Sequence, residues 1–476
     1  MDLLKWIDER SAFFTTISDK IWSFAETGYR EKNSARLLAD TLDEAGFAVE
    51  RGIAEIPTAF VGSYGEGKPV VAILGEFDAL PGISQQTVPQ QMPLVEGGNG
   101  HGCGHNLLGV GALAAAMAVK EAIAAGEMPG AIRYYGCPAE ENGSGKAFIT
   151  KAGLFDDVDI ALTWHPSMFN GSFTINLLAN MKVNFKFYGR AAHAAADPHN
   201  GRSALDAVEL MNVGVNYLRE HIIQDARIHY VIINGGGVAP NVVPPYAESL
   251  YLIRAPRPDQ LNAVYERVLD VARGAAQMTG TRMECAPVAG AANLLLNDTI
   301  ENLMLEKMNT VEPPQFDEAE KQFAQEVAAT FPPGGNFAGE YGRLLAPEAM
   351  RLLAGARPGV LFEGRLPAFK KEVTMPGSSD VGNVSWVVPT GQIMTTCQAI
   401  GTPGHSWQAV AQSGMSIGHK GMLYAGKVLA LSAAAFLQDP ALTAKARAEF
   451  DQRRSETPFV HTIPDGVKPP IPADAE

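Results

Sequence analysis

The stretch "GHGCGHN" at residues 100–106 places two histidines and a cysteine within five positions. The whole chain of 476 residues has only four cysteines and ten histidines, so this density is unusual. Imidazole nitrogen and thiolate sulfur are ligands that zinc and similar cations prefer. Cys103 and His105, just before an apolar helix, are therefore candidate metal ligands.

Further polar side chains follow segments that we interpret as buried strands. They are Asp78, the adjacent Glu140 and Glu141, His165 and His405. Loops that leave the carboxyl ends of strands in an open α/β sheet converge on one crevice. Each of these residues alone is more often a helix cap, a turn or a solvated position, but together they favour a shared site.

Five ligands are more than one catalytic ion with an open water position needs, so the set predicts two divalent ions, Mn²⁺ or Zn²⁺, that share Cys103. One of Glu140 and Glu141 can bind metal while the other acts as general acid and base, because neighbours on an extended segment point in opposite directions. Asp78 is placed to orient a ligand histidine.

The elements that must position these residues alternate between strands and helices. Val70 to Leu74 predicts a buried strand, and a helix follows Leu107 until Gly126. The first 50 residues predict two helices from their apolar spacing. This alternation indicates an α/β fold with a mixed, largely parallel sheet and helices on both faces.

A second pattern interrupts this body. Residues 180–291 predict strand, helix, two strands, helix and strand, the βαββαβ order of a ferredoxin-like domain. We therefore expect a discontinuous main domain, residues 1–179 and 292–476, with an inserted domain at 180–291.

Composition excludes some classes of partner. The formal net charge of −14 disfavours nucleic acid, whose binding proteins carry basic stripes. The N-terminus lacks the layout of a signal peptide, and Lys120 and Glu121 interrupt the longest apolar segment, so neither export nor a membrane span is expected. We expect a cytoplasmic protein whose four cysteines are thiols.

The motifs "HGCGHN", "PAEENGSGK", "WHP", "GRAAHAAADPHNGRSALDAV", "APNVVP" and "GTPGHSW" together resemble the amidohydrolase branch of the two-metal aminoacylase/carboxypeptidase family of metallopeptidases. The resemblance runs over nearly the whole chain and implies Glu140 as general base. It implies as metal ligands Cys103, His105, Glu141, His165 and His405.

The resemblance also implies that the inserted domain is a lid and dimerisation domain. His193 would reach the partner subunit's site and stabilise the oxyanion. Asn241 and Arg254 would hold the substrate carboxylate, with Arg257 and Arg190 as alternative arginines. We expect a homodimer, or a dimer with a homologous second subunit.

Two positions depart from the family pattern. Asn106 stands where many relatives carry aspartate, and Asn142 follows the glutamate pair where many have glycine. The missing charge beside His105 leaves the choice between zinc and manganese open.

The ligand set and the resemblance together imply hydrolysis of the amide between an acyl or aroyl group and an amino acid, with p-aminobenzoyl-glutamate as leading substrate. Alternatives are a broad N-acyl-amino-acid hydrolase or dipeptidase, and a non-catalytic metal-binding scaffold subunit. A cysteine hydrolase using Cys103 is disfavoured, because a cysteine and a histidine so close in sequence diverge too far for proton transfer.

Overall fold

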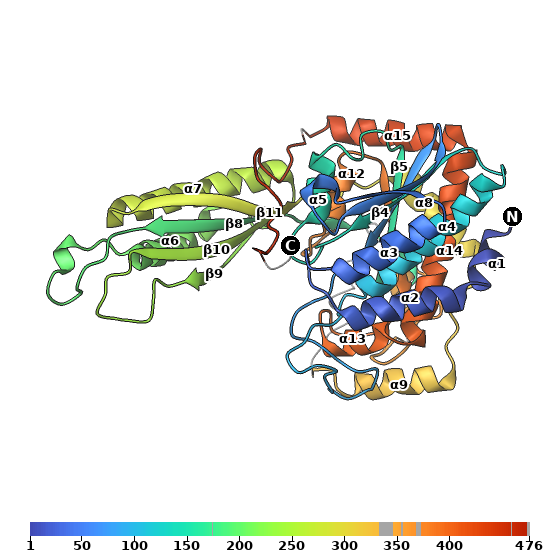
Figure 1. The fold of residues 1–476 in the computed structure, drawn as a ribbon, viewed down its shortest axis with the longest axis horizontal. Helices are drawn as coiled ribbons and strands as arrows, with labels where there is room; N and C mark the ends of the chain where they lie inside the picture. The colour runs from blue at the N-terminus through green and yellow to red at the C-terminus, as the bar shows by residue number, and fades with distance from the viewer. Residues whose placement is uncertain (174, 333–345, 354–355, 368–372, 458, 474–476) are drawn as a thin grey trace.

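The computed structural model describes the chain except residues 174, 333–345, 354–355, 368–372, 458 and 474–476. Figure 1 shows a large α/β body from which an elongated unit projects, formed by one continuous middle segment of the chain. The mixed α/β fold class expected from the sequence is confirmed.

The body contains a seven-stranded sheet with the order β1-β2-β4-β3-β5-β13-β6. The central strands β4, β3, β5 and β13 are parallel, while β1, β2 and β6 pair antiparallel at the two sides. The strands are β1 Ala48–Arg51, β2 Phe60–Glu66, β3 Val70–Glu76, β4 Gly130–Cys137, β5 Ile160–Ser167, β6 Gly171–Ser172 and β13 Thr390–Thr396. A separate short parallel pair consists of β7 Asn176–Leu177 and β12 Thr374–Met375.

Both faces of this sheet are covered, which explains why every residue of β3 is buried. Val71 and Ile73 of β3 pack in one apolar cluster, and Ala72 and Leu74 pack in another on the opposite face. The first cluster includes helices α1 Leu3–Asp8, α2 Ser11–Phe24, α3 Lys32–Glu44, α4 His105–Ala124, α8 Asp298–Thr310, α14 Ser416–Gln438 and α15 Pro440–Ser455. The second includes α5 Gly145–Lys151, α12 Val381–Ser385 and the 3-10 helix η1 Ile53–Glu55. Smaller helices of the body are α9 Glu318–Ala328, α11 Pro347–Leu352 and α13 Trp407–Ser413.

The expectation of two helices in the first 50 residues is wrong. The apolar spacing continues from Trp6 to Trp22, but Arg10 leaves the helical conformation at φ −112° and ψ 13°. One expected helix is therefore split into α1 and α2, and α3 follows as a third.

The projecting unit has its own apolar core. Its sheet has the order β11-β8-β10-β9, antiparallel throughout, and two helices cover one face. The elements are β8 Ala179–Tyr188, η2 Pro198–Asn200, α6 Ala204–Leu218, η3 Arg219–His221, β9 Arg227–Asn234, β10 Tyr246–Ala255, α7 Pro258–Thr279 and β11 Arg282–Ala291. The domain limits expected above, and the function of this unit as a lid, stay predictions.

In the part of the chain that the structure describes, two helices, α4 and α14, are long and apolar enough to cross a membrane by length and composition alone. The most apolar window of each is 78% and 72% buried inside the protein, respectively. They pack against each other and the sheet, as core helices do.

Candidate active site

A cavity of about 950 Å³ lies where the carboxyl ends of the parallel strands meet the projecting unit. The loops after β4, β5 and β13 and the segment before α4 all contribute to its wall. Loops at this edge of an open α/β sheet converge, so residues distant in sequence meet here. The predicted site residues in the wall are Cys103, Glu140, Glu141, His165, Arg254 and His405.

A tight turn before α4 positions the first of these residues. Gly104 has φ +74°, a left-handed conformation that favours glycine, and His105 then begins the helix. Cys103 and His105 lie in one cluster as a result. His101 does not join them, since its Nε2 lies 3.0 Å from the carbonyl oxygen of Ile21.

Cys103, His105 and His165 form a first cluster whose ligand atoms all lie within 4.8 Å of one another. Cys103 Sγ is 3.4 Å from His165 Nε2. His105 Nδ1 donates to Asp78 Oδ1 at 2.8 Å, and His165 Nδ1 donates to the carbonyl oxygen of Pro166 at 2.7 Å. Each ring is therefore held through Nδ1 and presents Nε2 to the cluster, the arrangement typical of metal-ligating histidines.

A second cluster within the same distance consists of Cys103, Glu141 and His405. His405 Nε2 lies 3.4 Å from Glu141 Oε2. The backbone of His405 has φ +54°, a strained conformation of the kind that gathers at functional sites. The Glu141 N–H donates to Asp78 Oδ2 at 3.0 Å, so Asp78 braces both clusters, and Cys103 belongs to both.

Glu140 and Glu141 diverge, but for a different reason from the one expected. The segment is a turn, entered through Ala139 with φ +58°, and not an extended strand. The turn places Glu140 in a third group with Glu76 and His105, away from the cluster of Glu141. The expectation of an extended segment is wrong, because the chain reverses directly after β4.

Burial sets the direction of the pKa shift for Cys103, His165 and Glu140. It raises the pKa of the Cys103 thiol to about 12 and lowers the pKa of His165 to about 4. Burial, together with the carboxylates of Glu76 and Asp380, also raises the pKa of Glu140 well above its ordinary value. His165 is therefore neutral near pH 7, and the anionic form of Cys103 is costly unless a cation offsets its charge.

The residues present fit a divalent metal centre. Among the buried atoms without a hydrogen-bond partner in the described part of the chain are His105 Nε2 and Glu141 Oε1. Buried polar atoms normally have a hydrogen-bond partner, so one unpaired ligand atom at each of the two clusters requires an explanation. Sulfur, imidazole nitrogen and carboxylate oxygen together suit a borderline divalent cation such as zinc, and imidazole with carboxylate also suits manganese.

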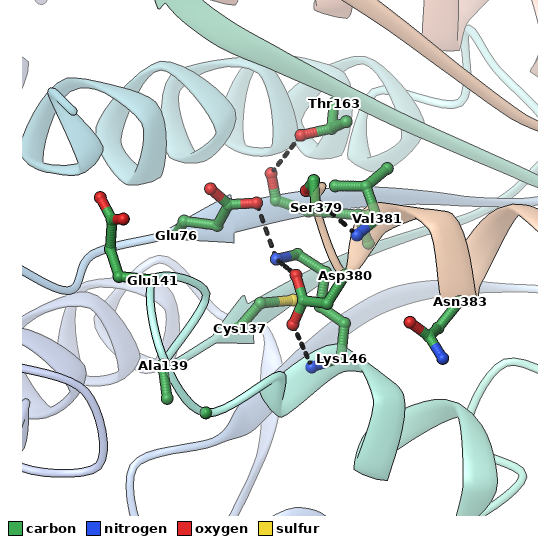
Figure 2. A network of polar contacts seen from close by, with 12 residues as sticks. Glu76, Cys137, Ala139, Glu141, Lys146, Thr163, Ser379, Asp380, Val381 and Asn383 are labelled. Carbon is green, nitrogen blue, oxygen red and sulfur yellow. Dashed lines mark hydrogen bonds and ion pairs between the residues drawn. The ribbon is translucent and has the colours of Figure 1, made fainter. Parts of the chain in front are cut away.

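Sequence reasoning missed a buried ion cluster behind these groups, which Figure 2 shows. Lys146 Nζ lies 2.7 Å from Glu76 Oε1 and 2.5 Å from Asp380 Oδ1, and all three side chains are buried. Although burial alone would lower the pKa of Lys146, Asp380 and Glu76 raise it well above its ordinary value. The cluster anchors Glu76, whose Oε2 is 3.2 Å from His105 Nε2.

The partners in this cluster are far apart in sequence, since 234 positions separate Lys146 from Asp380. One feature of the sequence indicated that a buried ion pair should exist. Glu76 ends the strand "VVAILGE", in which every other residue is apolar or glycine, and a charge buried there requires a partner.

Of the three arginines considered for a substrate carboxylate, Arg254 lines the cavity, where its Nη1 donates to Ser378 Oγ at 2.8 Å. Arg257 is not in the wall and forms an ion pair with Asp259 at 2.9 Å. Arg190 is not in the wall either. The structure thus brings only Arg254 of the three to the cavity.

His193 and Asn241 lie outside this cavity, in neighbouring loops of the projecting unit. His193 Nδ1 accepts from the N–H groups of Ala195 and Ala196, at 3.2 and 3.1 Å, which leaves its Nε2 to carry the proton. Both residues are exposed. The structure of one chain does not bring them to the metal-ligating side chains.

Comparisons with known proteins agree with this chemistry. The profile of peptidase family M20/M25/M40 matches residues 72–459. The chain is 45% identical over 466 residues to a subunit of p-aminobenzoyl-glutamate hydrolase from Escherichia coli K12, covering 96% of this chain and 95% of that protein. It is 29% identical over 472 residues to the Xaa-Arg dipeptidase of Mus musculus, covering 96% and 93%.

A solved structure shares the fold. It is a Bacillus subtilis protein described as a dinuclear metal binding peptidase from the M20 family, with a TM-score of 0.53 at 17% identity, covering 90% of this chain and 99% of that one. The family profile spans most of the chain, and the Escherichia coli relative aligns over almost its full length. The chain therefore belongs to the peptidase family M20/M25/M40.

Proposed function

We propose that this protein is a metal-dependent amide hydrolase that cleaves p-aminobenzoyl-glutamate into p-aminobenzoate and glutamate. The observation that carries the proposal is that Cys103 belongs to two ligand clusters at the wall of one large cavity. The reaction and substrate follow from the family and from the 45% identical relative that bears this activity in its name.

The cavity suits a ligand with an aromatic ring and a carboxylate. Phe173, Ile175 and Met375 pack together in one apolar cluster and line the cavity, where they can contact an aroyl ring. Arg254 lines it from β10 and offers a guanidinium fork to the α-carboxylate. A volume of about 950 Å³ accommodates a molecule of this size.

Two divalent ions would be held by this chain. The first would be bound by Cys103, His105 and His165, and the second by Cys103, Glu141 and His405. When bound, such ions polarise the scissile carbonyl and lower the pKa of the attacking water.

Glu140 would take the proton from the attacking water and deliver it to the departing nitrogen. Burial and neighbouring carboxylates raise its pKa, which favours the protonated form that must deliver the proton to nitrogen, whereas bound cations would favour the carboxylate that accepts it. Asp78 acts through others: by accepting from His105 and from the Glu141 N–H, it fixes two ligands in place.

Completion of the site would require a second chain. His193 and Asn241 lie outside the cavity of their own chain, so we propose that each serves the partner's site, His193 as the oxyanion donor and Asn241 at the substrate carboxylate. Among the described residues no strand pairs with the outer edge of β9, and its Val231, Ile232 and Ile233 are 53%, 41% and 49% exposed. Such an edge favours pairing with a strand of another subunit.

The partner would be a second copy or a homologous chain, since the relative's name designates it as one subunit of its enzyme. We place the protein in the cytoplasm. All four cysteines, Cys103, Cys137, Cys285 and Cys397, are free thiols, as the sequence predicted and as a reducing compartment favours.

The proposal is tested on the purified chain by following p-aminobenzoate release. Exhaustive chelation should abolish hydrolysis, and addition of Mn²⁺ or Zn²⁺ should restore it. Activity that survives with no bound metal would contradict the metal mechanism. A metal-loaded chain that hydrolyses no amide would instead favour the scaffold function, and a preference for acetylated neutral amino acids would favour a broad aminoacylase.

A further inference from the structure

The cavity has a second cation besides Arg254. Asn180 and Lys182 on β8, and Leu252 and Arg254 on β10, contribute to its wall from the projecting unit. In the antiparallel register Lys182 lies opposite Leu252, and Arg254 lies opposite Asn180. Lys182 and Arg254 are therefore diagonal neighbours on adjacent strands.

Both cations point to the same face of the sheet. The odd-numbered neighbours Met181, Val183 and Ile253 are buried in the core of the unit, under its two helices. Because side chains alternate along a strand, Lys182 and Arg254 project from the opposite face, where the cavity lies.

Neither cation has an ion pair with a carboxylate in the described part of the chain. Lys182 Nζ donates to the carbonyl oxygen of Asn142 at 2.9 Å, and Arg254 Nη1 donates to Ser378 Oγ. Both side chains are partly buried. Burial and the charge of Arg254 lower the pKa of Lys182 by more than Glu140 and Glu141 raise it. Two like charges held together without a direct ion pair favour an anionic ligand with two charges.

We propose that Lys182 and Arg254 form a two-cation subsite for a dicarboxylic leaving amino acid, in which Arg254 holds the α-carboxylate and Lys182 binds the side-chain carboxylate. The inference rests on the proposed function and specifies its substrate class. Lys182 selects glutamate over uncharged residues and repels a leaving arginine or lysine.

A lysine at this position distinguishes between the two kinds of substrate for which two relatives are named. One relative is named for a substrate that releases glutamate and the other for a dipeptide that ends in arginine. An ammonium group in the wall of the subsite favours the first and opposes the second by simple charge.

The test compares kcat/KM for p-aminobenzoyl-glutamate and p-aminobenzoyl-glutamine, which have nearly the same shape and differ by one charge. The wild type should prefer the glutamate substrate, and Lys182→Met should lower the glutamate-to-glutamine ratio by about 10- to 100-fold. Lys182→Arg should keep most of the preference. The control is Lys186→Met, which changes a lysine on the same face of β8 but outside the cavity wall and should leave the ratio unchanged.

A Lys182→Met variant that slows both substrates equally would overturn the subsite and assign Lys182 a structural contact with Asn142 instead. If the wild type hydrolyses neither substrate, the proposed function fails, and calorimetric binding of N-acetyl-glutamate and N-acetyl-glutamine decides the subsite separately. A preference for the dicarboxylate that disappears in Lys182→Met supports it, and equal binding of both ligands overturns it.

Discussion

At the scale of single residues, the arrangement depends on Cys103. Its sulfur is the ligand atom common to two clusters, and Asp78 braces both clusters through His105 and through the Glu141 backbone. A buried thiol with a pKa raised to about 12 is a poor nucleophile at neutral pH, which also argues against a cysteine hydrolase. The Cys103 sulfur is instead suited to bind metal cations, whose positive charge stabilises its thiolate form.

Replacing Cys103 by serine should lower the metal content of the purified protein, because both ions lose a ligand. Elemental analysis checks this. Cys285→Ser, in the sheet of the projecting unit, is the matched control and should keep the wild-type content. Equal metal content in Cys103→Ser and wild type would refute the shared-ligand assignment.

Replacing Glu140 by glutamine should leave metal binding intact while kcat falls by at least about 10²-fold, because the amide cannot take the proton from water. Steady-state kinetics with metal analysis on the same sample separates the two effects. Loss of the metal together with activity would instead identify Glu140 as a ligand, through its group with Glu76 and His105.

The sequence predicted several residue types of the site, because Glu140, Glu141 and His405 follow strands that are recognisable by their apolar runs. His165 was expected after its strand and instead lies within β5. The sequence did not predict the ion cluster behind these residues. Lys146 and Asp380 look like ordinary surface residues until the fold buries both beside Glu76. Their pairing depends on the relative position of α5 and α12, which no local pattern encodes.

At the scale of elements, the short loop between β4 and α5 contributes both glutamates of the candidate site. It enters its turn through Ala139, presents Glu140 and Glu141, and ends where Lys146 in the first turn of α5 binds Asp380. The Lys146 N–H also donates to Asp380 Oδ2 at 2.9 Å, so this loop is fixed to α12 at two atoms.

Lys146→Met should destabilise the fold by about 3–5 kcal/mol, because it leaves the carboxylates of Glu76 and Asp380 buried without their cation. Chemical denaturation measures the change. Lys445→Met, at an exposed position of α15, should change the stability by less than about 0.5 kcal/mol. Similar values for the two variants would show that the buried cluster contributes little.

At the scale of the whole molecule, the projecting unit carries His193 and Asn241 outside the cavity of their own chain. The βαββαβ pattern was readable from sequence because the helices and strands of this unit are long and regular. The break at Arg10 that separates α1 from α2 was not, because the apolar spacing continues across it.

The proposed action of His193 across a subunit interface predicts complementation between two inactive variants. Glu140→Gln and His193→Ala should each be nearly inactive alone. Mixed dimers contain one complete site, so an exchanged equal mixture should recover about a quarter of wild-type activity. Fluorescently labelled subunits confirm that exchange occurs. An inactive mixture in which exchange has occurred would mean that His193 does not act across the interface.

The most direct test of the central claim is anomalous diffraction from crystals of the protein loaded with Mn²⁺ or Zn²⁺. Two anomalous peaks should lie in the cavity, both beside Cys103 Sγ, one adjoining His105 and His165 and the other adjoining Glu141 and His405. A single peak, or peaks remote from Cys103, would contradict the two-metal site.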